Sequence, residues 1–221
     1  MTPFLTVPFK FSPEALNWIM DFIKPIVEDY QRNAPLNAAL LTLSDDQINL
    51  IKASPAWPEI ITVGKQYNLG KPWPQLFVYK KLGQPRRTNL GNPHIDTYGP
   101  GGTSQTVCVR FNILLKGEDT TEMVWWDHTQ DSELVITSQF VRPDLSIANR
   151  LQIKGKDLNE QWALLGEPNY RATHLGKVQE YASFVRTDII HALNWTGNQP
   201  RVVFSLRFPG TWDEFTRSNQ S

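Results

Sequence analysis

The sequence contains a single cysteine, Cys108, among 221 residues, which excludes a fold held together by internal disulfides. One cysteine is compatible with a reducing compartment, and we expect the protein to be cytoplasmic. No stretch approaches the roughly 18 consecutive apolar residues that a membrane-spanning helix needs. The N-terminus lacks a basic segment followed by an apolar run, so no signal peptide is predicted. No association with a membrane is expected.

The chain also lacks an excess of either charge. Its 22 basic and 22 acidic side chains cancel. A chain without net positive charge has no overall electrostatic attraction for nucleic acid, so nucleic acid is not expected as a partner. With 40% hydrophobic and 20% charged residues, the composition is that of an ordinary globular protein. The length predicts a single domain over residues 1–221.

Helix signals occupy the N-terminal third of the chain. Ser12 as N-cap and Pro13 at the first helical position predict the start of a helix. Pro25 is expected to kink or interrupt it. Ser44 is expected to cap a second, short helix. We therefore expect residues 1–60 to form helical support, with apolar residues of the first helix at helical spacing: Leu16, Ile19, Met20, Ile23 and Val27.

Strand signals follow after about residue 60. The segment 106–115 alternates, with Val107, Val109, Phe111, Ile113 and Leu115 on one face. Many short strands with Gly/Pro turns predict a mainly β sandwich or barrel, with a core over residues 75–208. We interpret 143–171 as an insertion with one short helix, flanking the active site. Further strands are predicted at 75–79, 123–126, 133–141, 181–195 (broken near Thr187) and 201–208.

The tripeptide His94-Ile95-Asp96 is the first candidate metal motif. In extended backbone, residues two apart point the same way, so both side chains can reach one ion. The tripeptide alone is weak evidence, because it occurs by chance. His191, far downstream at the end of an apolar segment, supplies a second imidazole. Two imidazoles and one carboxylate form the facial triad of non-haem Fe(II) oxygenases. The alternative for His191 is a hydrogen-bonded, partly buried strand histidine.

Arg201 stands ten positions after His191, at the start of an otherwise apolar strand. Arg201, Ser205 and Arg207 share one face of that strand. If this face lines a pocket, Arg201 supplies two parallel donors to a carboxylate and Ser205 adds a hydroxyl. The alternative is a solvent face that carries two exposed arginines.

With these residues the chain resembles the Fe(II)/2-oxoglutarate-dependent oxygenases over about residues 75–208. The interval from His191 to Arg201 is similar to that in prolyl 4-hydroxylase-type and aspartyl/asparaginyl hydroxylase-type members. Arg201 and Arg207 also resemble the paired arginines of the AlkB-type nucleic-acid demethylases. The Asn-x-Tyr motif that precedes the metal loop in those enzymes is absent, which argues against a DNA-repair function.

The resemblance implies a double-stranded β-helix, or jelly roll, with supporting N-terminal helices. It implies Fe(II) held by His94, Asp96 and His191, with 2-oxoglutarate and O2 as cosubstrates and Arg201 on the distal carboxylate of 2-oxoglutarate. The expected reaction hydroxylates a C–H bond of an amino-acid, peptide or protein side chain, or of a small metabolite, and releases succinate and CO2. Additional cosubstrate contacts are expected from Tyr79, Arg110, Asn112, Ser205 and Arg207.

Two other functions stay open at this point. One is a cupin-like metal-binding jelly roll that is non-catalytic or independent of 2-oxoglutarate. Such sites usually carry more histidines and a Glu near the first motif, where this chain offers His94 and Asp96. The other is a capsid-like or lectin-like structural jelly roll.

Overall fold

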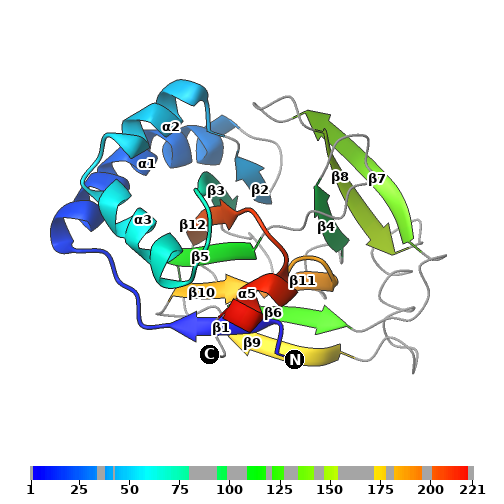
Figure 1. Cartoon of the computed structure of the whole chain (residues 1–221). Helices are drawn as coiled ribbons and strands as arrows, with labels where there is room; N and C mark the ends of the chain where they lie inside the picture. Colours follow the sequence, from blue (N-terminus) through cyan, green and yellow to red (C-terminus); the bar gives the residue numbers. More distant parts are fainter. Residues whose placement is uncertain are drawn as a thin grey trace.

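We analysed a computed structural model of the chain (Figure 1). Its secondary structure comprises two antiparallel β-sheets and helices gathered mainly at the N-terminal end of the chain. The residues that it describes are 2–33, 38–41, 43–79, 94–98, 109–117, 121–126, 134–141, 147–153, 172–177, 182–195 and 201–218.

Each sheet contains six strands in the described part of the chain, and the chain crosses between the two sheets several times. The first sheet, sheet A, has the order β1 (Phe4–Val7), β10 (Ala182–Val185), β5 (Val109–Lys116), β12 (Arg201–Phe208), β3 (Trp73–Tyr79) and β2 (Ala38–Leu41). The second sheet, sheet B, has the order β7 (Leu134–Val141), β8 (Ile147–Ile153), β4 (His94–Tyr98), β11 (Ile190–Trp195), β6 (Thr121–Trp126) and β9 (Ala172–Lys177).

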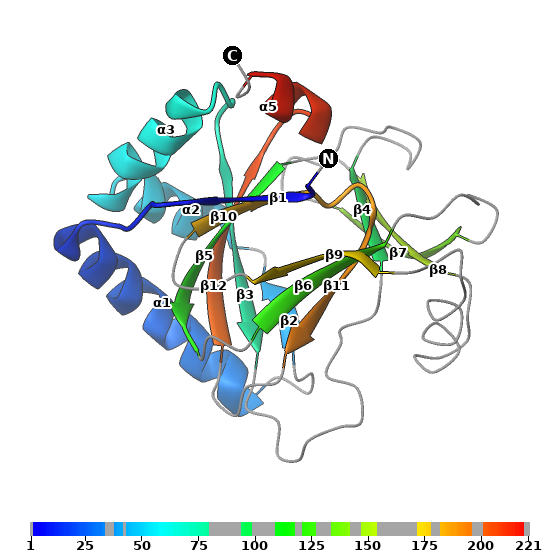
Figure 2. The same ribbon diagram turned by 90° about the horizontal axis from the view of Figure 1, so that it is seen from below.

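This arrangement confirms the predicted mainly β class, a double-stranded β-helix with supporting helices. All the strand pairs within the two sheets are antiparallel in the residues described. Chain segments far apart in sequence become neighbours in this way: β12 pairs with both β3 and β5, and β11 pairs with both β4 and β6 (Figure 2).

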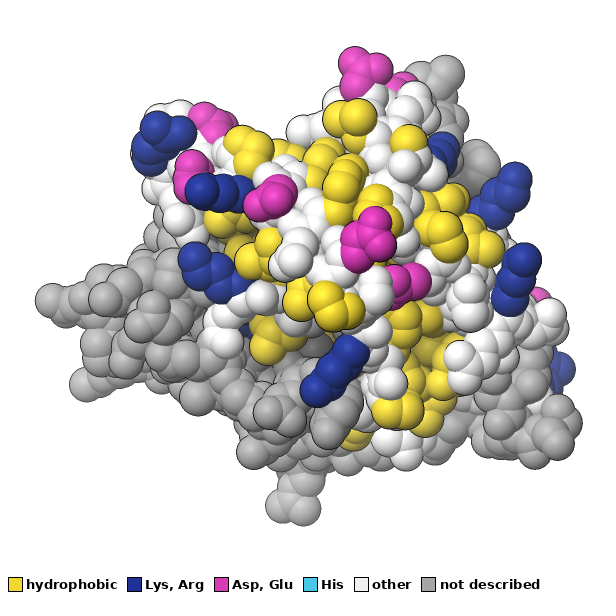
Figure 3. Space-filling model, turned by 90° about the vertical axis from the view of Figure 1, so that its left-hand side faces the viewer, with side chains coloured by type: hydrophobic (Ala, Val, Ile, Leu, Met, Phe, Trp, Pro, Cys, Tyr) yellow, Lys and Arg dark blue, Asp and Glu magenta, His cyan; other side chains and the backbone are white. Residues whose placement is uncertain are grey.

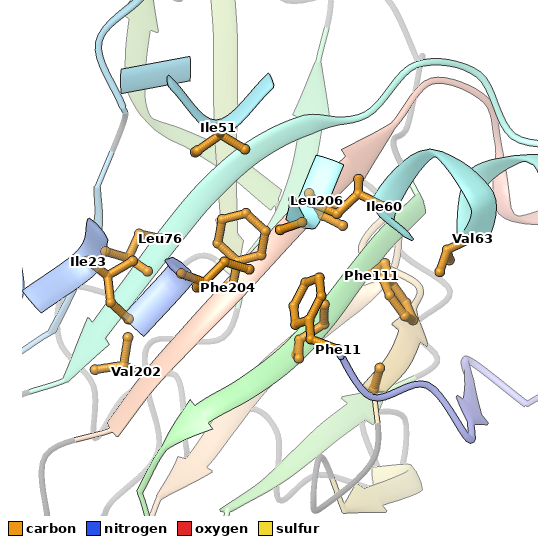
Figure 4. Close-up of a cluster of buried hydrophobic side chains, with 14 of the residues drawn as sticks. Phe11, Ile23, Ile51, Ile60, Val63, Leu76, Phe111, Val202, Phe204 and Leu206 are labelled. Carbon is orange, nitrogen blue, oxygen red and sulfur yellow. The ribbon is translucent and has the colours of Figure 1, made fainter. Parts of the chain in front are cut away.

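Helices cover one face of sheet A and bury the main core against it (Figures 1 and 4). They are α1 (Pro13–Asn33), α2 (Asp45–Lys52) and α3 (Ala56–Gln66), and a further helix, α5 (Trp212–Ser218), follows β12. The core joins Ile23 of α1, Ile51 of α2 and Ile60 of α3 to Phe204 of β12. None of the helices among the described residues is long and apolar enough to cross a membrane.

The predicted helix starts are largely correct. Helix α1 begins at Pro13, as predicted, and Ser44 caps α2 through a capping box in which its hydroxyl accepts the Gln47 backbone N–H. The expected interruption at Pro25 is wrong, because α1 continues through it to Asn33. Buried Ile19, Ile23 and Val27 lie on both sides of Pro25 in one core, so tertiary packing outweighs the loss of one backbone hydrogen bond.

Other differences concern elements that carry little sequence signal. Helix α3 is not among the helices expected from the sequence. Pro55 precedes it as N-cap and Pro58 lies in its first turn, where the missing N–H costs no helical bond. Strands β1, β2 and β9 were also not predicted. Within the expected insertion 143–171, residues 147–153 form β8 of sheet B, and the rest lies outside the described residues.

Charges on the helical side of the molecule are mixed (Figure 3). Lysines and arginines alternate with aspartates and glutamates over this face, and apolar side chains lie between them. Neither sign forms a continuous patch in this view, as the balanced composition suggests.

Candidate functional site

The face of sheet A that points away from the helices carries buried polar side chains. Along β12, alternate residues face opposite ways: Val202, Phe204, Leu206 and Phe208 pack in the helical core, whereas Arg201, Ser205 and Arg207 do not. This second face turns toward sheet B, because Val185 of β10 packs with Met123 and Trp125 of β6. We call it the inner face.

Arg201 is deeply buried on the inner face, with 3% of its surface exposed. It pairs in register with Tyr79, and its guanidinium carbon lies 5.3 Å from the centroid of the Tyr79 ring. Burial lowers the pKa of the guanidinium from its ordinary value, with a smaller opposing effect of Tyr79. The Nε atom is buried without a hydrogen-bond partner. A buried donor of this kind costs free energy unless a ligand satisfies it, and a carboxylate matches the guanidinium fork.

Gly117 makes room for Arg201 where β5 ends beside the start of β12. A Cβ added to Gly117 would lie 3.1 Å from the Arg201 Cα atom, tighter than ordinary contact. Its φ of +128° is also in the region that side chains disfavour. A glycine at this position therefore allows the backbone that carries Arg201 to sit close to the turn after β5.

Ser205 and Asn112 pair in register near the middle of the inner face. The Ser205 hydroxyl donates to Asn112 Oδ1 at 2.7 Å, and both side chains are buried. Ser183 of β10 is the next residue in register with Asn112 and is also buried. These short polar side chains lie on the inner face between Arg201 at one end of β12 and the pair Arg110 and Arg207 at the other.

Arg110 and Arg207 are directly opposite one another on β5 and β12, and both are buried. Arg110 Nη1 donates to Gln75 Oε1 at 2.9 Å, and the guanidinium carbon lies 5.4 Å from the Phe77 ring centroid. Arg110 therefore reaches across β12 to β3. Within the part of the chain that is described, the buried polar residues include three arginines and no aspartate or glutamate, so the described inner face favours anionic ligands.

His191 lies on β11 of sheet B and is 4% exposed. Its Nδ1 atom is 2.9 Å from the carbonyl oxygen of Ile189. A carbonyl oxygen only accepts, so Nδ1 carries the proton in the neutral ring and Nε2 bears the lone pair. A backbone carbonyl on the outer nitrogen is the usual support of a metal-ligating histidine. This contact favours the tautomer in which Nε2 is available to a metal ion.

His94 is brought beside His191 by strand pairing. The two residues are direct partners in the antiparallel register of β4 and β11, so their positions belong to the same face of sheet B. Asp96 is two residues further along β4 and shares that face. The side chains of His94 and Asp96 lie outside what the structure describes. Among described side chains, no three His, Cys, Asp or Glu residues gather, so the triad stays a prediction.

Residues on the two facing sheets could together hold a metal ion and a dicarboxylate. The Ile189 carbonyl orients the imidazole of His191. By strand register, the positions of His94 and Asp96 belong to the same face of sheet B as His191. On the facing sheet, Arg201 Nε is buried without a hydrogen-bond partner, so an anion bound beside it would satisfy this donor. Sequence reasoning missed Gln75, which binds Arg110; its alternation with Phe77 and Tyr79 along β3 was the available signal.

No known family model matches the sequence, and no curated relative matches it. Among solved structures, EvdO2 from Micromonospora carbonacea var. aurantiaca is similar, with a TM-score of 0.51 and 10% identity over 95% of this chain and 87% of that one. HygX from Streptomyces hygroscopicus, solved with nickel and 2-oxoglutarate bound, has a TM-score of 0.48 and 10% identity over 96% and 84% of the two chains. A Pseudomonas putida prolyl-4-hydroxylase has a TM-score of 0.44 and 7% identity over 95% and 93%. The chain shares its overall fold with EvdO2.

Proposed function

We propose that the protein is a non-haem Fe(II)- and 2-oxoglutarate-dependent oxygenase. Its substrate is an amino-acid or peptide side chain or a small metabolite, in which it hydroxylates a C–H bond and releases succinate and CO2. The observation that carries the proposal is the register pairing of His191 with His94, on the sheet that faces the buried Arg201. The sequence motif and the strand pairing thus point to the same pair of histidines.

In this proposal the metal is held by His94, Asp96 and His191. When bound, Fe(II) with 2-oxoglutarate supplies the oxidising chemistry, through decarboxylation of the cosubstrate and reaction with O2. The contribution of His191 is an imidazole whose Nε2 lone pair is directed by the Nδ1 contact to Ile189. Both histidines must be neutral to ligate, so metal binding is expected to weaken in acid.

The cosubstrate side of the proposal rests on Arg201. Its guanidinium binds the distal carboxylate of 2-oxoglutarate through charge-assisted hydrogen bonds, and Tyr79 supports the guanidinium from the neighbouring strand β3. Burial strengthens this contact, because water does not compete in the low-dielectric interior. Further contacts to the cosubstrate are assigned to Arg110, Asn112, Ser205 and Arg207, which line the same inner face.

The test combines binding and turnover. Purified protein is loaded anaerobically with Fe(II), and 2-oxoglutarate is added while the visible spectrum is recorded. A weak metal-to-ligand charge-transfer band is expected, followed by succinate formation when O2 is admitted. His191→Ala should abolish the band, and Arg201→Gln should weaken cosubstrate binding by about 30-fold or more, the effect of truncating a buried charge contact.

Arg217→Gln is the matched control for the arginine change, because Arg217 is an exposed residue on α5 and should leave the band unchanged. A wild-type protein that gives neither the band nor uncoupled succinate production contradicts the oxygenase assignment. Metal binding without any effect of 2-oxoglutarate would instead favour the cupin-like alternative.

A further inference from the structure

The segment that connects β10 to β11 delivers His191 to its place in sheet B. It contains four residues, 186–189, and crosses from one sheet to the other. Ile189 at its end accepts the hydrogen bond of the His191 ring. The position of this carbonyl therefore sets the direction of the imidazole, and whatever holds the crossing segment also orients His191.

Arg186, at the start of the crossing segment, is held by contacts of both its backbone and its side chain. Its backbone N–H donates to the carbonyl oxygen of Pro3 at 2.8 Å, and its carbonyl accepts from Trp125 Nε1 at 2.9 Å. Its guanidinium forms an ion pair with Asp188, with Nη2 to Oδ2 at 2.9 Å. Contacts from three parts of the chain thus fix the start of the segment that ends at His191.

Two of those contacts depend on the N-terminal strand. Strand β1 is the edge strand of sheet A beside β10, with Phe4 opposite Val185 (Figures 1 and 2). The Phe4 ring stacks on the Trp125 ring, with centroids 5.5 Å apart and an interplanar angle of 10°. Trp125 is fully buried and pairs in register with His191, so both side chains lie on the same face of sheet B.

We propose that Phe4 and Trp125 are positioning residues for His191, and that the N-terminal strand is therefore part of the support of the metal site. Phe4 holds the Trp125 ring, whose Nε1–H holds the Arg186 carbonyl at the start of the crossing segment. The other end of that segment presents the Ile189 carbonyl to His191. This inference rests on the proposed function, because it takes His191 as a metal ligand.

The chain offers a matched control on the same strand. Val7 is also buried, but it packs in the core between sheet A and the helices, on the opposite face of β1 from Phe4. Val7→Ala and Phe4→Ala both remove apolar contacts from β1, yet only Phe4→Ala removes support from Trp125. If the two changes only destabilise β1, both variants should bind metal more weakly. If Phe4 positions His191, only Phe4→Ala should do so.

The experiment titrates Co(II) alone, as a stand-in for Fe(II), into the full-length protein and its variants by calorimetry, and follows the Co(II) absorption spectrum. Phe4→Ala is expected to raise the Co(II) dissociation constant by about 10- to 100-fold, the usual effect of removing support from a ligating histidine. Trp125→Phe, which keeps an aromatic ring but removes the donor to Arg186, should weaken binding in the same direction. Phe4→Tyr, which keeps the stacking, should bind like wild type. Val7→Ala should stay within about twofold of wild type, because it lies away from the site.

The outcomes separate this inference from the proposed function. If wild type binds Co(II) but Phe4→Ala and Trp125→Phe bind it equally well, the inference is wrong and the metal site stands. Equal weakening in Val7→Ala and Phe4→Ala also overturns the inference, because it indicates a general effect on stability. If Phe4→Ala does not fold, Trp125→Phe decides. A wild-type protein that binds no metal overturns the proposed function and the inference together.

Discussion

The two faces of β12 differ in what their burial does for the molecule. On the helical face, Phe204 and Leu206 belong to a core cluster of apolar side chains from four helices and the neighbouring strands. On the inner face, Arg201 and Arg207 are buried to a similar degree but carry charge. Apolar burial stabilises the fold directly, whereas burial of a guanidinium opposes it. Alternating residues of β12 are therefore similarly buried, but burial of the apolar residues raises the free energy of unfolding and burial of the arginines lowers it.

This contrast separates the stabilising side of the strand from the functional side. Natural sequences depart from the rules of stable packing mainly where function requires it. Buried arginines are such a departure, and they occur on one face only of β12. Changes on the helical face are therefore expected to cost the most stability, whereas changes to the buried arginines of the inner face are expected to affect ligand binding.

The largest effect on stability is expected for Phe204→Ala on the helical face. Phe204 is 1% exposed and contacts the core formed by α1, α2 and α3 (Figure 4). Removing a buried phenyl ring leaves a cavity and should lower the free energy of unfolding by about 3–5 kcal/mol. Urea denaturation followed by circular dichroism measures this loss. A loss below about 1 kcal/mol would mean that neighbouring side chains fill the cavity, or that Phe204 packs less tightly than its burial indicates.

A smaller loss of stability is expected for Ser205→Ala, one position further along the strand and on the inner face. The change leaves the Asn112 carbonyl oxygen without its hydroxyl donor in a buried place. An unsatisfied buried acceptor should cost about 1–3 kcal/mol. The same denaturation experiment applies. The double variant Ser205→Ala, Asn112→Leu serves as control, because it removes the buried acceptor together with its donor. If the Ser205→Ala variant alone is as stable as wild type, another group satisfies Asn112.

The alternation of β12 made the division between its faces predictable from the sequence. Arg201, Ser205 and Arg207 fall on one face and the apolar residues on the other, and the structure has this arrangement. The sequence could not reveal that Arg201 lies opposite Tyr79, or that Arg110 reaches Gln75, because register between distant strands depends on the whole sheet. The break near Thr187 was also predicted, and it separates β10 from β11.

Other features depended on contacts that no local pattern records. The pairing of His94 with His191 joins segments far apart in the chain, and only their residue types suggested it. The stacking of Phe4 on Trp125 had no sequence signal, because β1 is a short edge strand next to a proline. The continuation of α1 through Pro25 likewise depends on packing against sheet A rather than on helix propensity.

A smaller effect on stability is expected for Arg201→Met, which would test the inner face directly. The pKa of the buried Arg201 guanidinium is lowered by burial, and its Nε has no hydrogen-bond partner. Replacing it with an apolar side chain of similar length removes that unfavourable burial, so the ligand-free variant should be as stable as wild type or slightly more so. Urea denaturation without ligand measures this. A loss of more than about 2 kcal/mol would show that Arg201 stabilises the fold, and would remove the contrast between the two faces.

The smallest effect appears only in alkaline solution and belongs to the helical side. Tyr67 packs on Phe184 and Phe215 with ring centroids 4.7 and 6.0 Å away, and burial raises the pKa of its phenol above its ordinary value. The unfolded chain therefore releases this proton first as the pH rises. The contribution of Tyr67 is fully present below the unfolded pKa and is lost as the pH rises through the folded pKa.

Tyr67→Phe removes this titration, so the variant should lose less stability than wild type between about pH 8 and about pH 11. Urea midpoints measured across that range give the comparison, and Tyr30→Phe is a second test because burial also raises the pKa of Tyr30. Both phenols belong to the helical side of the molecule. An alkaline loss that is the same in wild type and both variants would mean that these phenols are no more desolvated in the folded protein than in the unfolded chain. The pH dependence would then come from groups outside the helical core.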